Sequence, residues 1–387
     1  MSLEFDYQKL GSISDVKGGK RLPKGHSLIN IPNSHPYIKV KDMAPDKLLK
    51  LTDNFEYIEN ETFNEISHYI VNKGDLIISI VGTIGLTNII EYSLDNANLT
   101  ENCAKITNLK KGYNVDYIYY FLNSNIGQNL IQESTVGAVQ KKLPIKNIRD
   151  LNIPFPNFDI QNKIVDLLST IDKKIENCKS INKNLTRISS NIFRSLVNNE
   201  NVDEYLELNE ICKFIKGRKP KEISDNYQSN FSNYLTIEAL TNQNQTYAYD
   251  EKGVEANEYD ILMVMDGASS GKMFYGKKGL VGSTLAKIDV KEGYQEIIFQ
   301  FLKFNEKYIS DNTTGSAIPH TDKGLILNLK CPLSNKLLEY SNIFKDIRTS
   351  IISNNEEIIT LQKLRDTLLP NLMSGEIDVS KINCDLK

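Results

Sequence analysis

Tryptophan is absent from the 387 residues, histidine occurs only four times, and the five cysteines never form a Cys-x-x-Cys step. Because the cysteines are odd in number and far apart, they predict free thiols rather than a disulfide framework or a zinc site; they are Cys103, Cys178, Cys212, Cys331 and Cys384. The apolar runs are short, the best being Leu76 to Val81, whereas a membrane span needs roughly 18 apolar residues. The first residues include acids and lack an apolar signal core, so we expect a cytoplasmic protein that binds no membrane.

The motifs of nucleotide- and metal-dependent enzymes are also missing. Four glycines follow short apolar runs, but neither a Walker sequence nor a dinucleotide fingerprint surrounds them, so we interpret them as turn glycines: Gly82, Gly85, Gly267 and Gly271. A catalytic Asn/Asp-Pro-Pro-aromatic step of an adenine methyltransferase is absent, although Asn152-Ile-Pro-Phe is a partial echo, and no repeated Asp/Glu-x-Lys cluster marks a Mg²⁺ nuclease. The sequence therefore predicts no catalytic centre, no metal and no cofactor in this chain.

The overall composition is that of a soluble globular protein, with 40% hydrophobic and 25% charged residues. The length favours two or three domains. The net charge of −3 argues against a uniformly basic surface, but nucleic-acid binding needs only one basic face.

The chain contains a duplication in which five short blocks recur in the same order. The blocks begin at Leu10, Tyr37, Gly74, Ser134 and Leu151 in the first copy, and at Leu208, Tyr234, Tyr259, Asn312 and Leu329 in the second. The shift between copies falls from 198 (208 − 10) to 178 (329 − 151), so the first copy holds about 20 residues more. A repeat of this length is too long for a solenoid, so each copy is expected to be a globular domain followed by an appendage.

The appendage is predicted to be a long helix with a heptad pattern. In the first copy Asp159 is the expected N-cap, and the positions expected to pair are Ile164, Leu167, Ile171, Ile181, Leu185 and Ile188. In the second copy the corresponding positions are Phe344, Ile347, Ile351, Ile358, Leu361 and Leu368. Lys174, Asn354 and Arg365 interrupt the two stripes, and a polar residue such as Asn354 inside a seam can fix its register.

Such apolar stripes need a partner, because each helix of about 38 residues would span roughly 57 Å. The comparable stripe in this chain is the other copy, so antiparallel pairing of the two helices is predicted. Packing of each helix on its own globular domain is the alternative.

The globular segments carry short apolar runs that suggest buried strands, Leu76–Val81 and Ile261–Met265, and helical patterns at Val115–Leu122 and Gln295–Tyr308. The predicted fold class is α+β, with two α/β-type globular domains separated by two long antiparallel coiled-coil helices in a pseudo-twofold internal repeat. The predicted domain boundaries are 1–150 and 199–330 for the globular domains, and 151–198 and 331–378 for the helical spacers.

This order of domain and helix resembles the specificity subunits of type I restriction–modification enzymes over essentially the whole chain. The likeness is carried by the Gly-Asp-Leu-Ile-Ile-Ser strand at 74–79 with Gly82 and Gly85 after it, by Gly137-Ala-Val-Gln, by the step Ile148–Pro156 and by the helix start at 159–165. The most specific segment is LQKLRDTLLPNLMSGEI at 361–377, which is typical of these subunits. The second copy departs from the pattern at 335–339, which lacks the Glu-Gln step of the family.

The resemblance implies a subunit that does no chemistry of its own. In the family, each target-recognition domain reads one half of a split site in double-stranded DNA, and the paired helices act as a ruler between the halves. The helices also dock two methyltransferase subunits, which bind S-adenosylmethionine and methylate adenine. ATP-dependent restriction subunits are a further partner that the resemblance allows.

Two stretches without acidic residues are the first candidates for DNA contact. Val16–Lys41 and Ile211–Lys221 hold several cations, and glycines or prolines beside them let the backbone approach a phosphate. The selected residues are Lys17, Gly19, Lys20, Arg21 and Lys24 in the first copy, and Lys216, Gly217, Arg218 and Lys219 in the second. A merely solvated loop is the alternative, but recurrence at equivalent places in a net-acidic chain favours DNA.

The loop before each long helix is the second candidate. It contains Thr135, Gly137, Gln140, Lys141 and Lys142 in the first copy, and Gly315, Ser316, His320 and Lys323 in the second. Glutamine pairs with adenine and lysine with guanine or phosphate in the major groove, whereas a polar turn is the alternative. A coiled-coil scaffold that binds protein and never DNA fits the heptads equally well, but it does not explain the duplicated basic loops.

Overall fold

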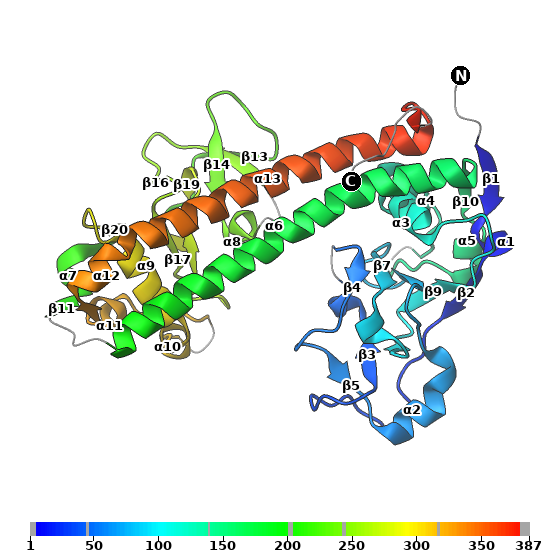
Figure 1. Ribbon diagram of the computed structural model, residues 1–387, viewed down its shortest axis with the longest axis horizontal. Coiled ribbons are helices and arrows are strands. Elements are labelled where there is room, and N and C mark those ends of the chain that lie inside the picture. Colours follow the sequence, from blue (N-terminus) through cyan, green and yellow to red (C-terminus); the bar gives the residue numbers. More distant parts are fainter. Residues whose placement is uncertain are drawn as a thin grey trace. The chain divides into compact units, whose positions relative to one another are not determined.

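The computed structural model describes residues 5–43, 46–137, 140–199, 204–241, 245–315 and 318–379. The chain divides into two compact units: unit 1 is Met1–Ile175 with Ile359–Lys387, and unit 2 is Glu176–Ile358. Two long helices, α6 (Phe158–Asn199) and α13 (Ser341–Ser374), each contribute one part to unit 1 and one part to unit 2 (Figure 1). Among the described residues, no helix has both the length and the apolar character that crossing a bilayer requires.

The described residues of unit 1 form three sheets and several short helices, and their apolar side chains gather in one large buried cluster and two smaller ones. The five-stranded sheet has the order β2 (Asp15–Gly18), β9 (Cys103–Thr107), β6 (Leu76–Ser79), β7 (Thr87–Ile90), β4 (Leu48–Leu49). The three-stranded sheet is β5 (Glu56–Tyr57), β3 (Pro36–Ile38), β8 (Asn98–Leu99), and β1 (Asp6–Lys9) pairs with β10 (Asn152–Phe155). The α-helices are α1 (Leu10–Ile13), α2 (Asn60–Ile66), α3 (Val115–Asn123), α4 (Asn125–Glu133) and α5 (Ile145–Arg149). Three 3₁₀ turns occur at Val40–Asp42, Ser67–Tyr69 and Tyr92–Leu94.

Unit 2 repeats much of this arrangement. Its four-stranded sheet has the order β12 (Cys212–Lys216), β20 (Leu285–Val290), β17 (Ile261–Val264), β18 (Met273–Tyr275). A five-stranded sheet follows the order β13 (Glu222–Ser224), β15 (Thr246–Tyr249), β14 (Ser232–Leu235), β19 (Gly279–Val281), β16 (Glu255–Ala256), and β11 (Glu204–Glu207) pairs with β21 (Lys330–Leu333). The helices are α7 (Leu208–Ile211), α8 (Ile237–Leu240), α9 (Gln295–Phe304), α10 (Glu306–Asp311), α11 (Lys323–Leu327) and α12 (Asn335–Glu339).

Strand pairing shows that the sequence duplication is also a structural one. The antiparallel pair β6 and β9 in unit 1 corresponds to β17 and β20 in unit 2. The parallel pair β3 and β8 corresponds to β14 and β19, and the terminal pair β1 and β10 corresponds to β11 and β21. The predicted α+β class and the internal repeat are confirmed.

The two predicted core strands are β6 and β17, and all of their residues except Ser79 are apolar. All four residues of β6 and of β17 are buried, so both faces of each strand pack against other parts of the unit. The helix predicted at Val115–Leu122 is α3, whose N-cap Asn114 accepts hydrogen bonds from the backbone N–H of Asp116 and Tyr117. The helix predicted at Gln295–Tyr308 is instead two helices, because the chain leaves α-helical geometry at Asn305, whose side chain binds Phe301 O over 2.8 Å.

The start of α6 differs from the prediction by two residues. Asn157, and not Asp159, accepts the backbone N–H of Ile160 through its side-chain oxygen at 3.0 Å. Asparagine caps helices as well as aspartate does, and here the side chain of Asn157 is the one that reaches the first turn. The second long helix is interrupted near its start, because α12 ends at Glu339 and α13 begins at Ser341.

Within each unit, the local parts of α6 and α13 pack antiparallel. In unit 1, Ile164 and Leu168 of α6 share a buried cluster with Leu369 and Leu372 of α13. Further along α6, Asp172 binds Arg365, which lies earlier in α13. In unit 2 the two helices also run antiparallel. Along α6, Cys178 contacts Glu357 and Asn182 contacts Asn354 and Asn355. Further on, Phe193 shares a buried cluster with Phe344.

The buried stripe of α6 does not follow all the predicted positions. Ile164 and Ile171 are buried and Leu185 is half-buried, but Leu168 and Ile175 take the places expected for Leu167 and Lys174. The alternation of four and three then continues to Asn182 and Ser189, so Ile181 and Ile188 are exposed, at 48% and 47%. The prediction that these two residues pair with α13 was wrong. The residues that face α13 are set by their position on the helix, and at this turn that residue is Asn182, whose amide bonds polar partners on α13.

The stripe of α13 lies where it was predicted. Phe344 and Ile358 are buried, at 0% and 7% exposure. Four other predicted positions are half-buried: Ile347, Ile351, Leu361 and Leu368. The helix continues through Pro370, which lacks a backbone N–H, for one more turn to Ser374.

Candidate nucleic-acid interface

The first basic segment of each unit is fixed to the unit by equivalent backbone hydrogen bonds. In unit 1, Gly19 N donates to Cys103 O at 3.0 Å and Lys20 N donates to Leu99 O at 2.8 Å. In unit 2, the same two steps are Gly217 N to Leu285 O at 2.9 Å and Arg218 N to Val281 O at 3.2 Å. The two copies therefore hold the residues around these glycines in place with the same pair of backbone hydrogen bonds. We call this shared arrangement the backbone frame.

The two glycines are required by this close packing. A Cβ atom on Gly19 would lie 2.1 Å from Thr100 O, and one on Gly217 would lie 2.2 Å from Gly282 O. Only glycine permits such an approach between two backbone segments. Their structural role is thus contact with their own chain, which leaves the basic side chains beside them to face solvent.

The cations of unit 1 are exposed, and two of them are paired with acids. Lys17, Lys20, Arg21 and Lys24 are all exposed. Arg21 Nε donates to Glu101 Oε1 at 2.6 Å, and this bond raises the pKa of Arg21. Asp15 lies 3.3 Å from Lys17; its pKa is lowered, first by a hydrogen bond from Asn108 and then by Lys17. Exposed pairs of this kind contribute little to stability, so the cations remain available to a stronger anion.

In unit 2 the basic segment and the loop before the long helix meet on one carboxylate. Lys216 Nζ lies 2.9 Å from Asp266 Oδ2, and His320 Nδ1 lies 2.7 Å from Asp266 Oδ1. Burial raises the pKa of Asp266, but the bonds from His320 and Lys216 outweigh it, so the pKa is lowered overall. Arg218 Nη2 pairs with Asp250 at 3.1 Å, and both Arg218 and Lys219 are exposed.

The loop before the long helix has the same backbone design in both units. Val136 and Lys142 bridge in unit 1, and Thr314 and His320 bridge in unit 2. The left-handed glycines of these loops are Gly137, with φ of 103°, and Gly315, with φ of 92°. The exposed side chains are Gln140, Lys141, Lys142, His320 and Lys323, whereas the Thr135 hydroxyl donates to Gln132 O; Ser316 lies outside the described residues.

Both candidate regions of each unit are tied to the same central segments. In unit 1, Ile80 N donates to Asn102 O at 2.8 Å and Leu143 N donates to Ile80 O at 2.9 Å, next to the Gly19–Cys103 bond. In unit 2, Met265 N donates to Thr284 O and Thr321 N donates to Met265 O, both at 2.8 Å, next to the Gly217–Leu285 bond. The fold thus brings each basic segment and its pre-helix loop to one region of the unit.

The sequence did not single out a pocket beside Arg21 in unit 1. It has a volume of about 400 Å³ and is lined by Arg21, Tyr37, Lys39, Lys41 and Glu101, among others. Lys39 and Lys41 both bind the carboxylate of Glu56. Burial, together with Lys41, lowers the pKa of Lys39 to about 8. The acid-free stretch already contained both lysines, but Glu56 and Glu101 come from distant parts of the sequence.

A family model for the type I restriction modification DNA specificity domain matches residues 3–187 and 200–360. The chain belongs to this family. The two matches coincide with the two copies of the repeat, so the chain carries two specificity domains, and the resemblance found in the sequence is confirmed.

Named relatives agree with this assignment. Over 177 residues the chain is 30% identical to the type I restriction enzyme MjaVIII specificity subunit of Methanocaldococcus jannaschii, a match to 44% of this chain and 42% of that relative. It is 23% identical to the MjaIX specificity subunit of the same organism, over 98% of this chain and 95% of the relative. The fold is similar to the crystal structure of the type I restriction–modification S subunit from M. genitalium, with a TM-score of 0.58, 17% identity and 96% of each chain covered.

Proposed function

We propose that this chain is the non-catalytic DNA-reading subunit of a cytoplasmic type I restriction–modification complex, and that it reads a bipartite target. Residues 1–150 and 199–330 are the two recognition domains, each for one half-site, and 151–198 and 331–378 are the helical spacers. The observation that carries the proposal is the exposed basic segment that both specificity domains hold on the same backbone frame.

The exposed cations are assigned to the DNA backbone. Lys17, Lys20, Arg21 and Lys24 in unit 1, and Lys216, Arg218 and Lys219 in unit 2, would exchange carboxylate or water partners for phosphates. Such contacts orient a protein on the duplex and release counterions, which makes affinity depend steeply on salt. The pre-helix loops, with Gln140, Lys141 and Lys142 or His320 and Lys323, are assigned to the groove nearby.

The helices are assigned to docking two methyltransferase subunits. Ile181 and Ile188 are exposed and seven residues apart, so they lie on one face of α6 that its own partner helix leaves uncovered. The partner subunits would bind S-adenosylmethionine and methylate adenine in double-stranded DNA. ATP-dependent restriction subunits would join the same complex.

A titration with the methyltransferase subunit present tests the proposal. Fluorescence anisotropy with labelled duplexes is expected to show tight binding to one target, weaker binding to other sequences, and affinity that falls as salt rises. A coiled-coil scaffold without DNA specificity would give no binding, or binding without sequence preference. Methyl transfer to DNA by the isolated chain would contradict the non-catalytic assignment.

A further inference from the structure

Between the basic segment and the repeated block that begins at Tyr37 or Tyr234, the two copies are nearly equal in length but share no repeated block. In unit 1 this stretch is residues 22–36, and in unit 2 it is 220–233. If the chain reads two half-sites, as proposed above, the frame must recur while the base-contacting residues differ. Divergent, exposed stretches on a shared frame are therefore where base readers are expected.

In unit 2 the divergent stretch forms strand β13 and an exposed loop rich in amides. The loop, residues 225–230, reads Asp-Asn-Tyr-Gln-Ser-Asn, and every one of its residues is exposed. Among the described residues, the side chains of Asn226, Gln228 and Asn230 have no hydrogen-bonding partner. Three amide side chains within five residues are thus free to bind another molecule.

The strands around the loop hold it in place. β13 pairs antiparallel with β15, which places Ser224 opposite Tyr247, and Tyr247 also lies opposite Asn233 of β14. The ring of Tyr227, in the loop, meets the ring of Tyr247 edge-on at 5.5 Å. β13 is an edge strand of its five-stranded sheet, because β15 pairs with β14 on its other side, so the exposed loop after β13 lies at the edge of the sheet, where a major groove can approach it. Lys219 and Lys221 are exposed immediately before β13 and supply cations for the flanking phosphates.

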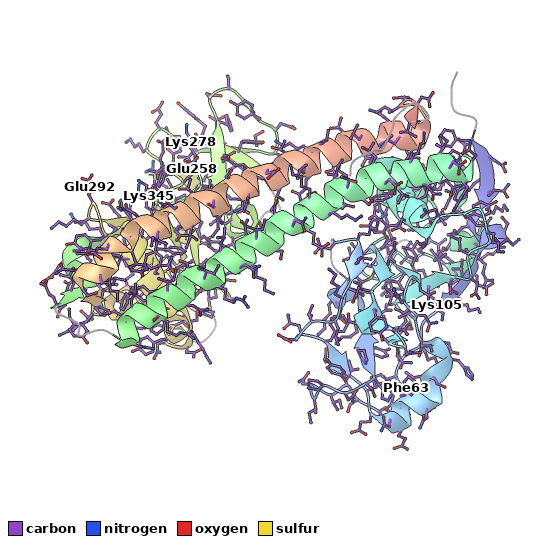
Figure 2. The ribbon with its side chains drawn as sticks, viewed as in Figure 1. Phe63, Lys105, Glu258, Lys278, Glu292 and Lys345 are labelled. Atoms are coloured by element: carbon purple, nitrogen blue, oxygen red, sulfur yellow. The ribbon has the colours of Figure 1, made fainter. Side chains whose placement is uncertain are left out.

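The equivalent stretch of unit 1 has no free set of amides. Asn33 is bonded at both ends of its amide, because Nδ2 donates to Ile58 O and Oδ1 accepts from His35 N. The ring of His35 binds Asn60 and stacks on the ring of Phe63 with the centroids 4.0 Å apart. Phe63 lies on α2 (Figure 2). Among the described residues, this stretch of unit 1 leaves one exposed amide, Asn30, without a hydrogen-bonding partner, against three in unit 2.

We propose that loop 225–230 is a base-reading element of the second recognition domain, and that Asn226, Gln228 and Asn230 recognise adenine in A·T pairs in the major groove. This inference rests on the proposed function. Adenine presents there an acceptor at N7 and a donor at N6, and an amide offers the matching donor and acceptor. The half-site read by unit 2 thus contains A·T pairs at positions that this loop contacts.

The test uses the full chain with the methyltransferase subunit and a pool of duplexes randomised in both half-sites. The variant is Asn226→Ala/Gln228→Ala/Asn230→Ala, and the matched control is Asn209→Ala, which removes an exposed amide of α7 in the same unit. Sequencing of the bound pool is expected to show at least a roughly 10-fold loss of preference for A·T at one or more positions of a single half-site. The other half-site and the salt dependence of affinity stay unchanged, since no phosphate contact is lost.

Two results would overturn the inference while leaving the proposed function intact. One is an unchanged preference at both half-sites; the other is a uniform loss of affinity for all sequences with a weaker salt dependence, which would assign the amides to phosphates. If the unaltered chain selects no sequence at all from the pool, the proposed function itself is wrong. Thermal unfolding of variant and control excludes loss of folding as the cause.

Discussion

Arg365 of α13 donates a hydrogen bond through Nη1 to Asp172 of α6 at 3.0 Å within unit 1. Asp172 also accepts the hydroxyl of Tyr120, from α3, at 2.6 Å. One carboxylate thus joins both long helices and the globular part of the unit. The sequence marked Arg365 only as an interruption of the apolar stripe, whereas the structure gives it a partner.

Removing one member of this group is expected to destabilise unit 1. Asp172 and Arg365 are about one-fifth and under one-third exposed, so Asp172→Ala leaves a partly buried guanidinium with only the exposed carboxylate of Asp366 as its partner. We predict a loss of about 2 kcal/mol in the free energy of unfolding, measured by urea denaturation. The double variant Asp172→Ala/Arg365→Ala should lose less than the sum of the single variants. Additive losses would contradict a direct interaction.

The three asparagines between α6 and α13 in unit 2 are expected to stabilise the helix pair only when all of them are present. Asn182 Nδ2 donates to Asn355 Oδ1 at 2.9 Å, and Asn354 Nδ2 donates to Asn182 Oδ1 at 2.7 Å. Asn182→Leu removes both bonds and leaves two amides facing an apolar side chain, so a loss of about 1–2 kcal/mol is expected. Replacing all three asparagines by leucine should recover stability, at the cost of a less defined register. Urea unfolding compares the variants, and a single variant as stable as the triple one would refute the account.

The cations of the two basic segments are expected to contribute to DNA affinity without contributing to sequence choice. Lys20→Ala/Arg21→Ala in unit 1 and Arg218→Ala/Lys219→Ala in unit 2 should each weaken binding to every sequence. The slope of log affinity against log salt should flatten by about one unit for each lost phosphate contact. Anisotropy titrations at several salt concentrations measure this, with Lys9→Ala, an exposed lysine of β1, as the control. Selective loss at one base position would instead make these residues base readers.

Three buried thiols are expected to resist alkylation in the folded chain. Burial raises the pKa of Cys103, Cys212 and Cys331 to about 12. The reactive thiolate is therefore scarce at pH 8, and mass spectrometry after iodoacetamide treatment should find these residues unmodified until urea is added. Ser180→Cys, on an exposed position of α6, should react at once and serves as the control.

The same pKa shift gives a pH dependence of stability. The unfolded thiols ionise near their ordinary pKa of 9.0, whereas the folded thiols stay protonated. Their contribution is thus present below about pH 9 and is lost as pH rises above it. Rapid alkylation of these three thiols in the native chain at pH 8 would contradict both predictions, because it would show that the thiols are accessible to solvent.

The sequence predicted those features that repeat or persist over long stretches. Long or repeated apolar patterns predicted the duplication, the fully buried strands β6 and β17, helix α3 and the two long helices. The register of α6 was less predictable: Ile181 and Asn182 are neighbours, and choosing the polar residue for the seam depends on Asn354 and Asn355, more than 170 residues away (354 − 182 = 172).

The sequence predicted which residues belong to the candidate interface, but not which residues of the same unit they bond. The basic segments and pre-helix loops were selected from charge and glycine content, and the structure brings them together in each unit. Asp266, which joins Lys216 and His320, was not predicted, because its role depends on three segments that meet only in the folded unit. The amide loop at 225–230 contains no lysine or arginine and has no match in the first copy, so a search for repeated cations passes over it.

Mapping methylated adenines in DNA tests the central claim most directly. The chain and a variant with one heptad inserted in both α6 and α13 are each expressed with the methyltransferase subunit, and the modified sites are sequenced. The account predicts a bipartite motif whose two half-sites are the same for both chains. In the variant the spacer lengthens by about three base pairs, since seven helical residues add roughly 10 Å. A single continuous motif, or an altered half-site with an unchanged spacer, would contradict it.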